Sequence, residues 1–174
     1  MKRGLKFEIK HTFDCDLRSL EDALLGVELL QFLAHTMNSI LSIRPVEIRT
    51  DGDVIRRRVE YHPEPQISRI GAWRVPDQWH AWVEESTYDR KTRTLYYRNI
   101  PLTGRLQNVL LNEGTITFHE ENGRVVRTLR GQLEVKARWL GGLAEKVIYR
   151  QAMRLLDEEA LATQQFLRMA TAHP

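Results

Sequence analysis

Apolar and polar residues alternate along the first regular segment of the chain. In LKFEIKHTF, residues 5–13, the odd-numbered positions hold apolar residues and His11, whereas the even-numbered positions hold charged or polar residues. Strict alternation with a period of two is typical of a β-strand that buries one face. We therefore predict that the chain begins with a half-buried strand.

The pattern changes to the 3.6-residue period of a helix over residues 14–41. Ser19 is a suitable N-cap, acidic Glu21 and Asp22 follow in the first turn, and Gly26 is placed to divide the segment into two pieces. The segment is therefore predicted to form helical structure directly after the first strand.

Three hairpins are predicted for the middle of the chain. Each consists of two alternating segments around a turn signal, and the turns are Asp51-Gly52, residues 89–92 and Asn122-Gly123. Asp-Gly and Asn-Gly supply the positive φ angles of tight hairpin turns. Segment 63–78 contains three prolines and is predicted to be a surface loop. Gly114 and Gly131 are expected to permit bends or bulges in the last hairpin.

The last predicted element is one amphipathic helix from Gly142 to Met169, about 40 Å long at 1.5 Å per residue. Its mostly apolar stripe has a helical period and comprises Ala144, Val147, Ile148, Gln151, Ala152, Leu155, Leu156, Glu159, Ala162 and Phe166. Hairpins imply an antiparallel sheet, and one face of that sheet needs a cover. We therefore predict an α+β fold in which a curved sheet of about seven strands encloses a space against this helix.

Composition fits a single globular domain that spans residues 1–174, because 42% of the residues are hydrophobic and 28% are charged. The 26 Lys and Arg residues are dispersed among 23 Asp and Glu residues, unlike the concentrated basic stripe of a nucleic-acid binder. No apolar run approaches the about 18 residues of a membrane span. The single cysteine, Cys15, excludes an intrachain disulfide and a Cys-based zinc site, and it favours a reducing, cytoplasmic location.

Residues 82–102, WVEESTYDRKTRTLYYRNIPL, contain a Glu-Glu-Ser strand, an Asp turn and a strand that ends in Arg-Asn-Ile. These features resemble a motif of the PRELI domain, and the matching positions are Glu84, Glu85, Ser86, Asp89, Arg98 and Asn99. The segment GGLAEKVIYR is similar to the glycine-led last helix of that domain and of an uncharacterised bacterial branch of the same superfamily. The order of elements and these motifs together resemble the helix-grip folds of the START and birch-pollen-allergen (SRPBCC) superfamily, and the segment from about Ile43 to Leu167 is most similar to its PRELI domain. The resemblance implies an antiparallel sheet around a long C-terminal helix, and the binding or carrying of a hydrophobic ligand.

Arg57 is the first candidate ligand-binding residue, because it lies on the apolar face of its predicted strand together with Tyr61. A buried cation needs a partner, since an unpaired charge is expensive to bury. A guanidinium suits the two oxygens of an anionic headgroup or carboxylate. The alternative is an ion pair with a strand glutamate such as Glu85 or Glu113.

His11 is a similar polar residue on the apolar face of the first strand. Contact with a ligand is one interpretation, and a neutral imidazole that is satisfied by a hydrogen bond is the favoured alternative. A metal site is not predicted, because no second His, Asp or Glu stands at ligand spacing.

The hairpin in the middle of the chain supplies four more candidates. Tyr97 and Asn99 share a strand face and are placed to orient the polar end of a ligand, with cross-strand hydrogen bonds as the alternative. Trp82 and Glu85, on the preceding strand, complete the predicted ligand-binding set. Glu84 and Glu85 are adjacent in a strand and point to opposite faces, which excludes an acid–base pair.

An apolar gate is predicted in the loop from Pro63 to Pro76, where Ile67, Ile70 and Trp73 form a lid that touches ligand or membrane. The alternative is that this loop packs back onto its own domain, because tryptophan is usually well buried.

The sequence contains no nucleophile-elbow, Walker, dinucleotide-binding or zinc-protease motif, so no catalytic residue and no cofactor is predicted. We predict a protein that binds a lipid or another hydrophobic or amphipathic small molecule. Transfer of that molecule is a further hypothesis. Phospholipid is included among the expected ligands, together with transient membrane contact. A polyketide cyclase- or hydrolase-like enzyme on the same fold is the alternative. A third hypothesis is a protein with a filled core that acts only through partners.

Overall fold

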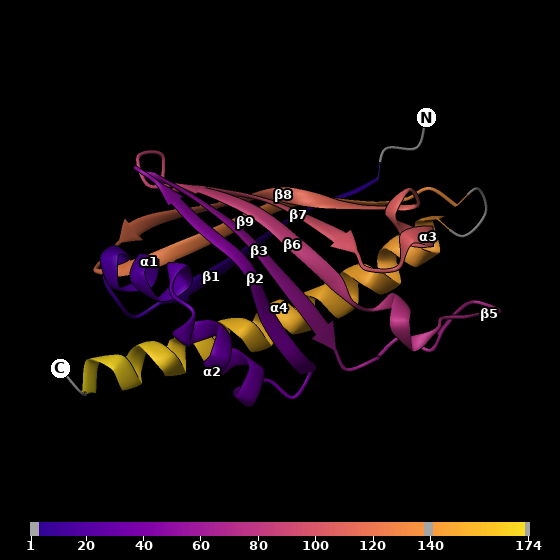
Figure 1. The fold of residues 1–174 in the computed structure, drawn as a ribbon, viewed down its shortest axis with the longest axis horizontal. Helices are drawn as coiled ribbons and strands as arrows, with labels where there is room; N and C mark the ends of the chain where they lie inside the picture. The colour runs from indigo at the N-terminus through magenta and orange to yellow at the C-terminus, as the bar shows by residue number, and fades with distance from the viewer. Residues whose placement is uncertain (1–3, 138–140, 173–174) are drawn as a thin grey trace.

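The computed structural model describes residues 4–137 and 141–172. Within them, a seven-stranded antiparallel sheet curves over the long C-terminal helix α4 (Gly141–Ala172), as Figure 1 shows. Two short helices, α1 (Leu17–Leu25) and α2 (Glu28–Thr36), lie toward the end of the molecule where α4 finishes. The α+β helix-grip arrangement predicted from the sequence is confirmed. Residues 1–3, 138–140 and 173–174, which the predicted domain also includes, lie outside the described residues.

The strands follow the order β1-β9-β8-β7-β6-β3-β2, so the first strand pairs with the last one. Their bounds are Leu5–Phe13 for β1, Ile40–Asp51 for β2, Val54–Pro63 for β3, Trp82–Asp89 for β6, Thr94–Pro101 for β7, Leu110–Glu121 for β8 and Arg124–Val135 for β9. All three predicted hairpins are present. At the Asn122-Gly123 turn both residues have positive φ, 52° and 73°, as an Asn-Gly hairpin turn requires.

Several small elements interrupt this pattern near the end of the molecule where α4 begins. A separate hairpin consists of β4 (Arg69–Ile70) and β5 (Trp73–Arg74), and a 3-10 turn follows at Asp77–Trp79. The one-turn helix α3 (Gly104–Gln107) connects β7 to β8. The predicted surface loop between β3 and β6 therefore contains a short hairpin of its own.

Asp16, and not Ser19, caps helix α1. The Asp16 carboxylate accepts hydrogen bonds from the backbone N–H of Ser19 at 2.8 Å and from its hydroxyl at 3.1 Å. Asp and Ser are similarly good N-caps, and the prediction therefore began the helix three residues too late. Gly26 divides the helical segment into α1 and α2, as predicted.

The bulges of the sheet lie in β2 and not in the last hairpin. The β8–β9 register runs without a shift through Gly114 and Gly131, which pair directly. Register shifts occur between Ile40 and Ser42 and between Pro45 and Glu47. The Tyr97 hydroxyl lies 2.9 and 2.6 Å from the positions that a Cβ would take at Gly114 and Gly131. The two glycines therefore leave room for a close approach of side chains.

One apolar cluster joins α1 to the inner face of the sheet and to α4. Phe13, Leu20, Ile55 and Val125 are at most 2% exposed there. A second cluster joins α2 to α4 and consists of Leu29, Leu33, Met37, Ile40 and Ala162. The core therefore fills the space between the sheet and the second half of α4.

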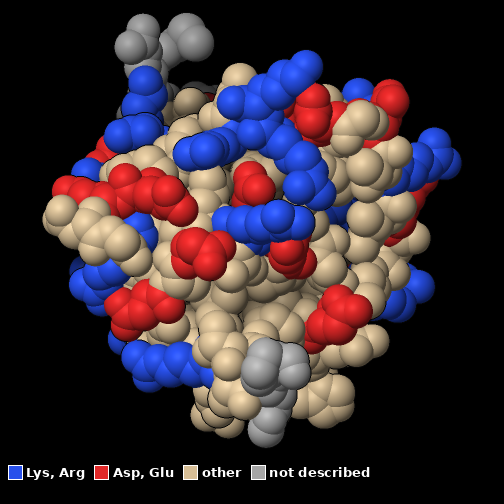
Figure 2. All heavy atoms as spheres, turned by 90° about the vertical axis from the view of Figure 1, so that its left-hand side faces the viewer, with Lys and Arg blue, Asp and Glu red and all other residues tan. Residues whose placement is uncertain are grey.

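Charged side chains of both signs are interspersed on the end of the molecule that Figure 2 shows. A surface hollow of about 600 Å³ lies between α1 and the β6–β7 turn, and its lining residues are Leu17, Arg18, Glu21, Asp22, Arg90, Arg93 and Glu120. None of the described helices combines the length and the apolar content that crossing a membrane requires.

Candidate ligand-binding site

The first half of α4 covers the sheet loosely. No residue of α4 between Ala144 and Ala160 is buried, although the apolar stripe of the helix continues through this stretch with Val147, Ile148 and Leu155. The backbone of the helix comes closest to β9, β1 and α2. Side chains of α4 such as Met153 and Leu156 nevertheless belong to the same apolar cluster as Ile55 on β3 and Tyr97 on β7. The backbone of α4 therefore lies farther from the inner face of β3, β6 and β7 than from β1 and β9.

Three rows of side chains point inward from these strands. Antiparallel pairing aligns Arg57, Ser86 and Tyr97 in the first row, Val59, Glu84 and Asn99 in the second, and Tyr61 and Trp82 in the third. Successive rows are about 7 Å apart, because two residues of an antiparallel strand rise that far. Four predicted ligand-binding residues, Arg57, Trp82, Tyr97 and Asn99, are thereby brought together on one face.

Arg57 is 7% exposed, and its guanidinium is only partly paired. Nη1 donates a hydrogen bond to the carbonyl oxygen of Leu24 in α1, and Nη2 lies 3.9 Å from Oε1 of Glu84. Nε has no hydrogen-bond partner among the described residues. A strand glutamate does accompany the arginine, but it is Glu84 and neither Glu85 nor Glu113.

Two more buried polar atoms of this face have no hydrogen-bond partner in the described part of the chain, Oγ of Ser86 and Oδ1 of Asn99. Buried polar atoms in proteins are nearly always satisfied by protein or water. Ser86 lies beside Arg57, and Asn99 lies beside Glu84, whose side chain keeps 22% of its surface exposed. Unpaired donors and acceptors thus gather on the inner face of β3, β6 and β7.

Aromatic rings border these polar groups. Tyr61 and Trp82 stack with ring centroids 5.1 Å apart and planes 11° from parallel. Burial, reinforced by the Glu84 carboxylate, raises the pKa of Tyr61 and of Tyr97 well above the ordinary value. Both phenols therefore remain protonated at neutral pH and are able to donate a hydrogen bond.

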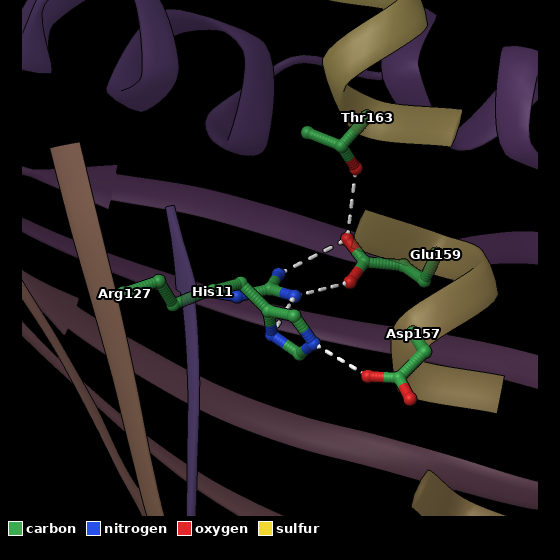
Figure 3. Close-up of polar contacts among 5 residues, drawn as sticks. All are labelled: His11, Arg127, Asp157, Glu159 and Thr163. Carbon is green, nitrogen blue, oxygen red and sulfur yellow. Dashed lines mark hydrogen bonds and ion pairs between the residues drawn. The ribbon is translucent and has the colours of Figure 1, made fainter. Parts of the chain in front are cut away.

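His11 belongs to a different cluster, which Figure 3 shows. Arg127 donates from Nη1 and Nη2 to the two oxygens of Glu159, at 3.1 and 2.7 Å, and from Nη2 to Nδ1 of His11 at 3.0 Å. Nε2 of His11 lies 2.9 Å from Oδ1 of Asp157, and the Thr163 hydroxyl donates to Glu159 at 2.9 Å. Because arginine can only donate, His11 accepts this hydrogen bond at Nδ1 and donates from Nε2 to Asp157. The structure therefore shows the hydrogen-bonded arrangement that was the favoured alternative.

The pKa of Glu159 lies below its ordinary value. Burial raises it, but the charge and hydrogen bonds of Arg127 and the Thr163 hydroxyl outweigh that effect. A carboxyl with a lowered folded-state pKa stabilises the fold above its unfolded-state pKa, and this contribution is lost as the pH falls through the folded-state value.

We therefore expect the difference in unfolding free energy between wild type and Glu159→Leu to be largest at neutral pH and to shrink below about pH 4. Urea unfolding at several pH values measures this difference. A difference that stays constant with pH would show that ionisation of Glu159 does not stabilise the fold.

Glu85 lies on the outer face of the sheet, and the prediction that it is a ligand-binding residue is therefore wrong. Its side chain is 45% exposed and forms an ion pair of 3.2 Å with Arg58. Strand alternation puts Glu84 on the same face as Trp82, and Glu85 on the opposite face. The same alternation is visible in the sequence, and it indicates Glu84 as the glutamate that faces inward.

The predicted gate residues lie at the end of the site where α4 begins. Ile70 and Trp73 pair across the β4–β5 hairpin, Trp73 is 52% exposed, and Ile67 precedes the hairpin as a half-buried residue. The hairpin reaches α4 through β4. The structure therefore places the predicted gate residues beside α4.

Neither of the two described surface hollows lies between the sheet and α4. One is the hollow beside α1, and the other, of about 550 Å³, lies over β1, β8 and β9 and is lined by Lys6, Phe7, Glu8, Glu113, Gly114, Thr115, Arg130, Gly131 and Gln132. Both have charged walls, which suit an apolar ligand poorly. Within the described residues, no group of His, Cys, Asp and Glu side chains is arranged to hold a metal ion.

No protein-family model and no curated protein matches this chain. Among solved structures, the chain is similar to TTHA0849 from Thermus thermophilus, with 15% identity, a TM-score of 0.67, and coverage of 95% of this chain and 99% of that one. It is similar to the ZhuI aromatase/cyclase from Streptomyces sp. R1128, with 12% identity, a TM-score of 0.64, and coverage of 94% and 93%. It is also similar to norcoclaurine synthase from Thalictrum flavum, with 15% identity, a TM-score of 0.60, and coverage of 95% and 88%. These likenesses show that the chain has a helix-grip fold, and they do not show the PRELI likeness.

Proposed function

We propose that this protein binds a hydrophobic or amphipathic small molecule between α4 and the inner face of β3, β6 and β7. The observation that carries the proposal is the set of three buried, unpaired polar atoms on Arg57, Ser86 and Asn99. They lie on an inner face that also carries aromatic and apolar side chains, and on which Tyr61, Trp82, Glu84 and Asn99 are only partly buried. A bound ligand would supply the missing partners, since small-molecule sites combine apolar walls with a few directed polar groups.

The apolar side chains of α4 and the stacked pair of Tyr61 and Trp82 would supply most of the binding energy. Burial of apolar surface contributes about 25 cal/mol per Å², so a ligand that buries about 200 Å² gains about 5 kcal/mol. The polar groups then fix the orientation of the ligand.

We also propose that a ligand enters the site beside the β4–β5 hairpin. The β4–β5 hairpin, with Ile67, Ile70 and Trp73, would act as a gate, because it lies toward the end of the molecule where α4 begins (Figure 1). With a lipid or phospholipid as ligand, the exposed Trp73 would contact the membrane surface during transfer. This transfer would take place in the cytoplasm, consistent with the single cysteine of the chain.

An enzyme of the cyclase type is the second candidate. The observation that favours it is the presence of two protonated phenols, Tyr61 and Tyr97, near the Glu84 carboxylate on one inner face. Such phenols can polarise a carbonyl group while a carboxylate accepts a proton. Two structures of the same fold are named as an aromatase/cyclase and as norcoclaurine synthase.

A fluorescence titration with N-phenyl-1-naphthylamine, an uncharged apolar probe, tests the proposed site. We expect saturable binding to the wild type and its loss in Ala152→Trp, because Ala152 belongs to the half-buried stripe of α4 and a bulky ring there fills the space. Arg154→Trp is the matched control, since Arg154 is exposed on the same helix. The proposal fails if the wild type shows no saturable binding, or if both variants bind the probe equally well.

A further inference from the structure

We propose that Glu84 makes this site selective for an uncharged ligand that offers both a hydrogen-bond acceptor and a hydroxyl or N–H donor, and that the site disfavours carboxylates and phosphates. The inference rests on the proposed function and narrows its ligand class. It also changes the role expected for Arg57, which the sequence suggested as a partner for an anionic headgroup.

The charges around the site balance one another. The charged groups that act on the Tyr61 hydroxyl, in the third row, are Glu84, Arg57 and Glu159. Glu159 is neutralised by the two hydrogen bonds of Arg127, and Arg57 faces the carboxylate of Glu84. No excess positive charge is therefore left among these groups to hold an anion.

The position of Glu84 opposes an anion directly. Its Oε1 lies 3.9 Å from Nη2 of Arg57, which is too long for a hydrogen bond but short enough for a strong charge interaction. An anionic group that accepts from the unpaired Nε of Arg57 would approach the Glu84 carboxylate as well. Like charges repel strongly where water is partly excluded, whereas a carbonyl or hydroxyl oxygen accepts the same hydrogen bond without that cost.

The second row requires a donor on the ligand. Oδ1 of Asn99 is an unpaired acceptor, and it lies across the β6–β7 pair from Glu84, whose carboxylate also only accepts. Ser86 lies in the first row beside Arg57, and its hydroxyl can either donate or accept. A hydroxylated ring or a hydroxy-carbonyl compound has an acceptor for Arg57 and a donor for Asn99. The stacked rings of Tyr61 and Trp82 offer a flat apolar surface beside these groups.

Two probes of the same ring size test the charge preference on the wild type alone. We expect 2-naphthol, which is uncharged at neutral pH, to displace N-phenyl-1-naphthylamine about tenfold more effectively than the anion 2-naphthoate. Equal or better displacement by 2-naphthoate overturns the inference, as does a failure of both compounds to displace a bound probe. Absence of probe binding would instead mean that the proposed function itself is wrong.

The chain offers a matched pair of variants to assign the preference to Glu84. Glu84→Gln keeps the shape of the side chain and removes its charge, so we expect the tenfold preference for 2-naphthol to disappear. Glu85→Gln removes a charge from the outer face one residue away and should leave the preference unchanged. A folded Glu84→Gln protein that still prefers 2-naphthol would show that Glu84 does not set the selectivity, and thermal unfolding checks that both variants are folded.

Discussion

Replacing Glu159 by leucine is expected to lower the free energy of unfolding by about 3–5 kcal/mol, because it leaves a buried cation without its partner. The Arg127 side chain is only 5% exposed, and both oxygens of Glu159 accept its hydrogen bonds. Nε of Arg127 has no partner among the described residues, and the acceptor nitrogen of His11 carries no negative charge that could replace the carboxylate. Urea unfolding at neutral pH measures the loss.

A double variant separates the cost of an unpaired charge from the value of the pair. Arg127→Met combined with Glu159→Leu removes both charges, and we expect it to recover most of the lost stability, since apolar residues often replace buried ion pairs without loss. A single Glu159→Leu variant that loses less than about 1 kcal/mol would contradict the view that Arg127 depends on Glu159.

Gly114→Ala is the second substitution with a large expected effect, about 3 kcal/mol of destabilisation. A Cβ at this position would lie 2.2 Å from the carbonyl oxygen of Arg130 and 2.7 Å from Cα of Gly131. Both are backbone atoms of a paired central strand, so they cannot move aside as a flexible side chain can. Thermal and urea unfolding measure the change.

Gly104→Ala is the matched control for this substitution. Gly104 begins the short helix α3, and apart from its chain neighbours and the backbone of its own helix no atom lies within 4 Å of the position of its Cβ. We expect its stability to stay close to that of the wild type. If both variants unfold alike, the close approach of strands at Gly114 does not limit the choice of residue there.

Much of the fold could be predicted from the sequence, because apolar and polar residues alternate along its strands and because Asn-Gly and Asp-Gly mark its turns. The hairpin β4–β5 was missed, since strands of two residues have no period to detect. The bulges were misplaced for a related reason. Glycine signals a possible bulge, but at Gly114 and Gly131 it instead makes room for Tyr97, which lies on another strand.

The site was predictable only in part. Arg57 stood out as a cation on an apolar strand face, and the same signal was present at Arg127, between Val125 and Leu129. The partners of these arginines could not be predicted, because Glu159 is 32 residues from Arg127 in the sequence and pairing depends on how α4 crosses the sheet. The prediction did not include Glu84, although Glu84 is two residues from Trp82 in the same strand and therefore lies on the same inner face.

The most direct test of the account is to locate a bound ligand by NMR. Backbone amide shifts would be recorded before and after saturation with N-phenyl-1-naphthylamine. We predict that the largest changes occur in β3, β6 and β7 around Arg57, Ser86 and Asn99, and in the first half of α4. Changes confined to the outer face around Lys6 and Glu8, with none on β3, β6 and β7, would contradict a binding site between the sheet and the helix.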